Sequence, residues 1–254
     1  MNFESFYNDT YNDFYNACEH NNLISNKPIP YNINENLRTA AEYSDGSVNI
    51  KKLPLNSKSE EKQLRSTLYH EFTHYYDEEL FKHHGYPSDD INILMLTFSE
   101  IHASYNGILS FLNYKDLKVK RRIPNTTKIF ENKNILQFCA FQTSLHVTNL
   151  NNVLGFKHLM YLLGEKRAFL AVSQDIQSII KAYNPKCIPN NIRNEITEID
   201  KSININIYKN IDVSYLSLRK LKVETMLTAQ SLKNIHLPIT PETEDIRKII
   251  DSIQ

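Results

Sequence analysis

The sequence lacks an excess of charge of either sign. Its 254 residues include 29 Lys+Arg and 29 Asp+Glu, so the formal net charge is zero. Without a strong overall field, nothing in the composition favours nucleic acid, an anionic membrane or an acidic partner. The basic run KDLKVKRR at residues 115–122 has no aromatic residues interleaved with it, and we interpret it as a solvated loop.

Paired cysteines and long apolar runs are also missing. Cys18, Cys139 and Cys187 lie far apart and form no CxxC pair, so the sequence predicts neither a cysteine-ligated metal nor a dithiol redox motif. No stretch is apolar for long enough to predict a membrane span, and the first residues lack the basic start and apolar run of a signal peptide. We therefore expect a cytoplasmic protein in a reducing compartment, or one delivered elsewhere by a route that needs no such signal.

The N-terminal part of the chain predicts one helix followed by a small sheet. Aromatic residues at helical spacing indicate an amphipathic helix over residues 3–21. Asp45-Gly46 lies between two short runs, which predicts a hairpin whose second strand covers Ser47 to Leu53.

Two long helices should follow the hairpin. Ser57 and Glu60 have the spacing of a capping box, so the first helix should begin there and end near Gly85. The second should cover about residues 91–113, and its nearly continuous apolar character predicts a central position in the fold.

The rest of the chain predicts more helices. Residues 134–183 are typical of two or three helices with breaks near Gly155 and Gly164, and residues 184–254 of a linker and further helices. We predict an α+β, mostly helical fold, with one domain over residues 1–183. Residues 184–254 are then a C-terminal helical extension packed on that domain.

The most informative stretch is LYHEFTHYYDEE, because it places His70 and His74 four residues apart. Residues at this spacing lie one above the other on a helix, so both imidazoles can reach one zinc ion. Glu71 lies about 100° round the helix, where it is offset from the ligand position but near enough to take a proton from a metal-activated water. The alternative is an exposed helix face that carries histidines by chance. Neighbouring apolar and aromatic residues argue against it, since unliganded histidines are costly to bury.

Glu100 is the candidate third ligand. It is the only carboxylate in the apolar helix predicted over residues 91–113, and a buried carboxylate needs a partner such as a metal ion. Ser104 and Gly107 are small residues on the same side, so this helix can approach the histidine helix closely. His102 lies about 200° away from Glu100 and cannot easily bind the same ion. The alternative for Glu100 is a structural buried carboxylate.

HEFTH followed by SEIHASYNG resembles the gluzincin group of zinc metallopeptidases over about residues 40–113. The resemblance implies a zincin-like fold, and it implies an edge strand at about Ser47 to Leu53 along which an extended peptide binds. It also implies a role for each residue of the site: His70, His74 and Glu100 are the zinc ligands and Glu71 is the general base.

Some positions depart from the gluzincin pattern or fit it only loosely. Ser104 stands where several members have an aspartate that orients a histidine.

Three further residues have open roles near the predicted site. Asp77 could hydrogen-bond a ligand or face water. His146 and Tyr105 are the available candidates for a donor that stabilises the oxyanion, although a histidine or tyrosine in such a position more often has an ordinary structural role.

The sequence thus predicts a zinc metallopeptidase, a hydrolase acting on a peptide or protein substrate. The alternative from another class is a zincin-derived binding or regulatory protein whose metal is structural or vestigial. A third interpretation is a helical interaction protein without metal.

Overall fold

The computed structural model describes residues 2–183 except residues 19, 38, 52–54, 131–132 and 150–154. The predicted extension over residues 184–254 therefore lies outside the described residues, and so does Cys187. Cys18 and Cys139 are free thiols.

The described part is a mixed α+β structure and mostly helical, as predicted. Its helices are α1 (Phe3–Ala17), α2 (Lys58–His83), α3 (Ser88–Leu94), α4 (Glu100–Phe111), α5 (Ile135–Asn149), α6 (Gly155–Val172) and α7 (Ile176–Ala182), with a short 3₁₀ turn η1 (Asn21–Leu23) and a π-helical segment η2 (Met95–Ser99). Its strands are β1 (Tyr31–Ile33), β2 (Ala41–Ser44), β3 (Ser47–Ile50), β4 (Lys128–Phe130) and β5 (Lys133–Asn134).

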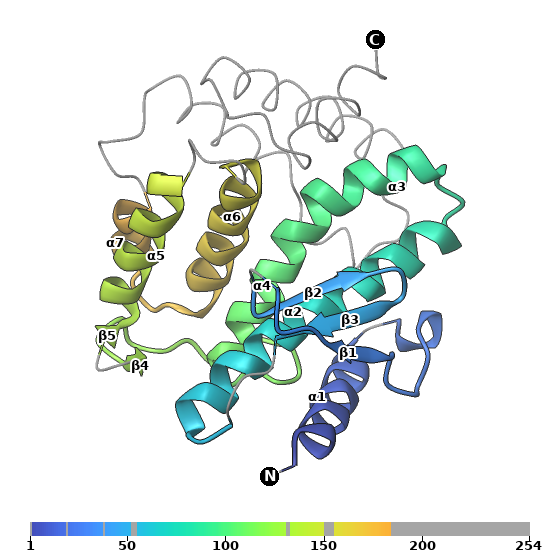
Figure 1. The fold of residues 1–254 in the computed structure, drawn as a ribbon. Helices are drawn as coiled ribbons and strands as arrows, with labels where there is room; N and C mark the ends of the chain where they lie inside the picture. Colours follow the sequence, from blue (N-terminus) through green and yellow to red (C-terminus); the bar gives the residue numbers. More distant parts are fainter. Residues whose placement is uncertain are drawn as a thin grey trace.

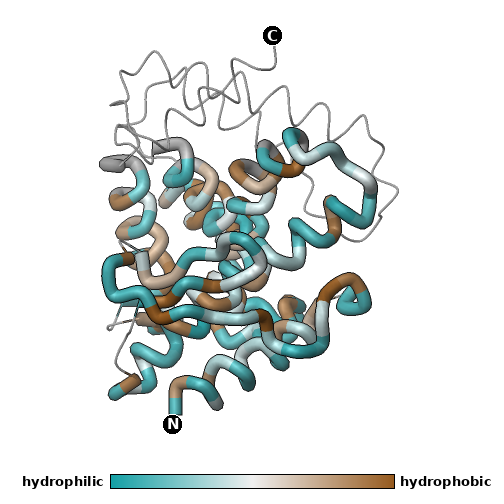
Figure 2. The backbone as a smooth tube through the Cα atoms, turned by 45° about the vertical axis from the view of Figure 1, so that its right-hand side comes forward, coloured by the Kyte–Doolittle hydropathy of each residue, from teal (hydrophilic) through white to brown (hydrophobic). Residues whose placement is uncertain are grey.

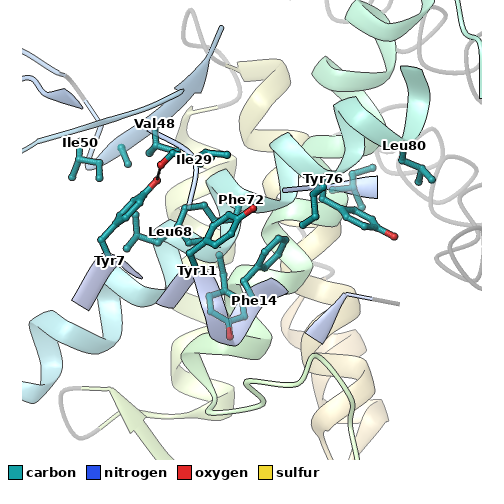
Figure 3. Packing of buried hydrophobic residues seen from close by; sticks show 14 of the residues in the cluster. Tyr7, Tyr11, Phe14, Ile29, Val48, Ile50, Leu68, Phe72, Tyr76 and Leu80 are labelled. Carbon is teal, nitrogen blue, oxygen red and sulfur yellow. Dashed lines mark hydrogen bonds between the residues drawn. The ribbon is translucent and has the colours of Figure 1, made fainter. Parts of the chain in front are cut away.

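The first helix is amphipathic but shorter than predicted, because Cys18 already has an extended backbone. Hydrophobic and hydrophilic residues alternate along it (Figure 2). Its buried face packs Tyr7 and Tyr11 edge-on against Phe72 of α2, with ring centroids 5.3 and 5.1 Å apart (Figure 3). Such edge-to-face pairs add to the stabilisation from burial alone.

The predicted hairpin is confirmed, with Asp45 and Gly46 both at positive φ (49° and 74°), as a tight two-residue turn requires. The predicted edge strand is wrong. The sheet order is β1-β3-β2, so the strand that begins at Ser47 is central, and β2 is the edge strand nearer to α2. The Asp45-Gly46 turn was sufficient to predict the pairing of β2 with β3. The parallel pairing of β1 with β3 could not be predicted in this way, because it joins residues 31–33 to residues 48–50 without a local turn signal.

The histidine helix α2 begins and ends where the sequence predicts. Ser57 caps it by accepting the Glu60 backbone N–H at 3.2 Å, and Glu60 accepts the backbone N–H of Asn56 at 2.8 Å. Gly85 ends the helical region at φ 71°.

The second long helix is helical from residue 88 to residue 111, close to the predicted 91–113, but a π-helical segment interrupts its α-helical geometry. It consists of α3, the π-helical segment and α4, and Glu100 is the first residue of α4. A π turn inserts one extra residue and rotates the next part of the helix about its axis, and such turns are frequent at functional sites. The residues of this segment gave no local signal for it.

Two hydrophobic cores meet at α4 and α6. In Figure 1 the three strands β1–β3 lie across α2, α1 lies below it, and α5, α6 and α7 stand together at the left. The first core lies among α1, the sheet and α2, and its central members are Tyr7, Tyr11, Phe14, Val48, Leu68 and Phe72. The second core lies among α4, α5, α6 and α7, and its central members are Leu109, Ile135, Cys139, Phe169 and Ile179. The region between them holds the candidate site.

Gly164 lies inside α6, so the predicted helix break at this residue is wrong. A Cβ there would lie 2.3 Å from the backbone oxygen of Ile101 and 2.7 Å from the Cβ of Ser104. The glycine therefore serves close packing of α6 on α4. Gly107 of α4 permits a second, looser approach, because its Cβ would lie 3.2 Å from the backbone oxygen of Ser66 on α2.

Replacing Gly164 by Ala should destabilise the chain by about 1–3 kcal/mol, because a backbone oxygen cannot move aside as a flexible side chain does. Gly107→Ala is the matched control. Its milder contact is offset by the roughly 1 kcal/mol that alanine contributes to a helix, so its effect should be near zero. Urea denaturation of both variants measures the difference, and equal stabilities would contradict the close packing of α6 on α4.

None of the helices in the described residues is both long enough and apolar enough to span a bilayer.

Candidate metal centre

His70, His74 and Glu100 come together between α2 and α4, as the sequence predicts. The Nε2 atoms of the two histidines are 3.1 Å apart, and each lies 3.4 Å from Oε2 of Glu100. These three form the only group of at least three His, Cys, Asp or Glu in the described residues that is close enough to hold a metal ion. The i,i+4 spacing on α2 brings the imidazoles together, and Gly107 lets α4 approach them.

The distances between these three atoms agree with the distances between ligand atoms in a tetrahedral zinc site. Bonds of about 2.0–2.1 Å at tetrahedral angles place ligand atoms roughly 3.3 Å apart, close to the observed separations. Oε2 of Glu100 is buried and has no hydrogen-bond partner in the part of the chain that the structure describes, and it lies 3.4 Å from each of the two imidazole Nε2 atoms. Two imidazoles and one carboxylate are a donor set that suits zinc. The residues present therefore fit the metal that the motif implies.

His74 is fixed by the π-helical segment. Its Nδ1 lies 2.8 Å from Oγ of Ser99, the last residue of that segment. With Nε2 turned toward the metal position, Nδ1–H donates to the hydroxyl and sets the tautomer. Sequence reasoning did not identify Ser99, because the π turn that places it gave no signal.

Glu71 is tied to the edge strand. Its Oε2 accepts the backbone N–H of Tyr43 in β2 at 2.8 Å. Glu71 is buried, yet it lines a pocket with His70. One carboxylate oxygen is therefore held in place while the side chain borders the pocket.

Lys157 of α6 forms an ion pair with the other oxygen of Glu100, Nζ to Oε1 at 3.1 Å. Burial alone would raise the pKa of Glu100, but Lys157 and His74 hold it well below its usual value. Burial alone would lower the pKa of His74, but Glu100 raises it above its usual value, with help from Glu71. In the metal-free chain His74 and Lys157 thus act as the counter-ions of Glu100.

Tyr161, one turn beyond Lys157 on α6, also borders the site. Its ring meets that of His70 edge-on at 5.5 Å, and it lines the same pocket. Burial, and then the negative charges of Glu100 and Glu71, raise its pKa well above the usual value, so the phenol stays protonated and can donate a hydrogen bond. Sequence reasoning missed both α6 residues, because nothing local indicates that α6 crosses α4 at this point.

Asp77 does not face water, so that predicted alternative is wrong. It is fully buried and lies 2.9 Å from Nδ1 of His102, a histidine outside the ligand set. His102 in turn lies 2.9 Å from Nδ2 of Asn106, which donates to Thr73. This series of hydrogen bonds links α2 to α4 beside the candidate metal centre. It agrees with the prediction that His102 does not bind the same ion as His70 and His74.

The two predicted oxyanion donors do not line the pocket at the metal centre. Tyr105 packs against the second core. His146 of α5 is buried beside Glu165 and His158. His158 therefore belongs to a cluster that the sequence did not indicate.

Ser104, where several gluzincins have an aspartate, lines the pocket instead of orienting a histidine.

The pocket has a volume of about 250 Å³ and connects the metal centre to the edge strand. It is lined from β2 and the residues before it by Thr39 and Ala41, from α2 by His70 and Glu71, and from α6 by Tyr161 and Glu165. A small ligand or part of a larger one can therefore reach His70 and Glu71 together.

No family model, curated protein or solved structure matches the chain. The gluzincin resemblance consequently stays a prediction from sequence, and the function has to be inferred from the residues themselves.

Proposed function

We propose that this protein is a zinc-dependent peptidase with a zincin-like fold. The observation that carries the proposal is that Glu71 and His70 line one pocket, while His70 also belongs to the candidate ligand set with His74 and Glu100. A structural metal is enclosed by its ligands, whereas a catalytic one keeps a position open to substrate. The pocket that reaches His70 therefore favours a catalytic role over a structural or vestigial metal.

The chain's own residues divide the work of hydrolysis. A zinc ion held by His70, His74 and Glu100 would supply Lewis acidity to a water molecule and to the substrate carbonyl. Glu71 takes a proton from the attacking water and delivers it to the leaving amine. Tyr161, kept neutral, donates a hydrogen bond to the oxygen that gains negative charge.

The substrate would lie along the free edge of β2. Ala40 accepts the backbone N–H of Lys51 at 2.9 Å, so alternation turns the N–H and C=O groups of Ala41 and Tyr43 outward. Tyr43 N–H is occupied by Glu71, and the Ala41 carbonyl already accepts the Thr39 hydroxyl at 2.9 Å. The N–H of Ala41, beside the pocket, is therefore the group for main-chain pairing with an extended peptide.

Metal removal tests the proposal directly. The purified chain should contain one zinc ion, measured by elemental analysis, and should cleave an unstructured protein such as casein. Chelation should abolish cleavage and one equivalent of zinc should restore it. His70→Ala should bind no zinc and cleave nothing. A zinc-loaded wild type that cleaves none of a broad peptide library would contradict the proposal.

Zinc binding should release protons below the raised pKa of His74. Glu100 raises this pKa against the effect of burial, so the metal-free chain keeps a proton on His74 to higher pH than an ordinary histidine does, and zinc must displace that proton. Below the raised pKa the zinc affinity should fall about tenfold per pH unit for each proton displaced. In the metal-free chain the ion pair stabilises the fold at low pH, and this contribution is lost as pH rises through the raised pKa. Calorimetry in buffers of different ionisation enthalpy counts the released protons, and a count of zero would contradict the His74–Glu100 pairing.

A further inference from the structure

Glu165 of α6 is a second carboxylate in the pocket, and the proposed mechanism does not use it. It lines the pocket together with Glu71 and Tyr161, and its residue exposure is only 7%. Tyr161 and Glu165 are four residues apart on α6 and so lie on the same face of the helix.

One oxygen of Glu165 is held by the protein and the other is not. Oε1 accepts Nε2–H of Gln142 at 3.1 Å and lies 3.2 Å from Nε2 of His146. Oε2 is buried and has no hydrogen-bond partner among the described residues. A buried carboxylate oxygen without a donor is costly, so a donor that enters the pocket beside Glu165 would relieve this cost.

Two neighbouring histidines, His146 and His158, lie on the protein side of Glu165. Burial, followed by the proximity of His146, lowers the pKa of His158 to about 4, so His158 is neutral near pH 7. The two Nδ1 atoms are 3.0 Å apart. The two Nδ1 atoms pair when His158 donates to His146. The Nε2–H of His146, which has no hydrogen-bond partner among the described residues, then lies 3.2 Å from Oε1 of Glu165.

We propose that Glu165 binds a positively charged nitrogen of the substrate and so sets the specificity of the pocket. This inference depends on the proposed peptidase function, because it names the substrate class for the same site. The nitrogen belongs either to a free N-terminal ammonium or to a lysine or arginine side chain, since both offer charged donors to a carboxylate.

The size of the pocket agrees with a residue of a peptide. Pockets for whole drug-sized ligands usually span about 300–1,000 Å³. At about 250 Å³ this one suits a single side chain or a chain end, while the rest of the peptide lies outside along β2.

Binding, not turnover, provides the test. Zinc-loaded Glu71→Gln protein is titrated by calorimetry with two matched pairs of short peptides. One pair has a free or an acetylated N-terminus, and the other, acetylated throughout, contains arginine or its uncharged isostere citrulline. At least one charged member should bind about tenfold more tightly than its partner, as expected for a hydrogen bond to a charged group. The pair that shows the difference identifies the source of the nitrogen.

The same titrations on Glu71→Gln/Glu165→Gln should show no difference within either pair, whereas Glu71→Gln/Glu35→Gln should behave like the single variant. Glu35 is an exposed carboxylate that does not line the pocket, so its removal controls for net charge. Zinc content and melting temperature verify that each variant is folded. Equal binding of charged and neutral peptides to Glu71→Gln, or a preference that survives Glu165→Gln, would overturn the proposal.

Failure of this inference differs from failure of the proposed function. If wild type cleaves peptides but the titrations show no charge preference, only the role of Glu165 is wrong. If the preference is present and depends on Glu165 while wild type cleaves nothing, the pocket binds a cationic ligand and the peptidase assignment is wrong.

Discussion

Glu71→Gln will abolish peptide hydrolysis and leave zinc bound. The amide oxygen of glutamine can still accept the backbone N–H of Tyr43, which Glu71 now accepts at 2.8 Å, so the side chain should keep its position. The amide cannot take a proton from water, however. Loss of a general base typically lowers the rate by about 10²–10⁴-fold, and kcat should fall by at least this factor.

The measurement compares kcat and zinc content for wild type, Glu71→Gln and Glu61→Gln. Glu61 lies in the first turn of the same helix and outside the pocket, so its replacement removes one charge from α2 but should preserve kcat. Zinc content should equal that of wild type in both variants. Undiminished hydrolysis by Glu71→Gln would refute its role as base, and loss of zinc would instead place Glu71 among the ligands.

Local sequence signals were sufficient to predict α2 and its histidines. A capping box, an i,i+4 pair and a glycine stop each depend on residues within a few positions of one another, and the structure places all of them as predicted. Glu100 could also be predicted, because a lone carboxylate in an apolar segment needs a partner wherever the segment packs.

The residues contributed by α6 could not be predicted in this way. Lys157, Tyr161 and Glu165 reach the site because α6 packs on α4 at Gly164, a contact between segments far apart in the chain. From sequence alone Gly164 indicates a helix break, and its packing role becomes visible only when the neighbouring helix α4 is in place. The edge strand was misassigned for the same reason, since the parallel pairing of β1 with β3 depends on tertiary structure.

The π turn shows a different limit. Residues 95–99 have apolar character compatible with any helix, and the extra residue in the turn leaves no local mark. Its effect is to bring Ser99 to 2.8 Å from His74. Prediction of a ligand from sequence is therefore easier than prediction of the residue that orients it.

Glu100→Gln will separate the ligand interpretation from the structural one. As a ligand, Glu100 supplies one of three donor atoms. Loss of an outer-shell partner costs about 10–100-fold in metal affinity, so loss of Glu100 should weaken zinc binding at least about 100-fold. As a merely structural carboxylate, it could be replaced with no effect on zinc affinity. Competition with a chelator of known affinity measures the change.

The same substitution should also destabilise the metal-free chain, because Lys157 loses the carboxylate that lies 3.1 Å from its Nζ. The cost should be about 1–3 kcal/mol, below that of a fully enclosed pair, since Lys157 is partly exposed. Lys157→Met keeps the apolar stem and removes the charge. The double variant Glu100→Gln/Lys157→Met should therefore regain most of the lost stability in urea denaturation while its zinc affinity stays low. Recovery of zinc binding together with stability would mean that the carboxylate acts only as the partner of Lys157.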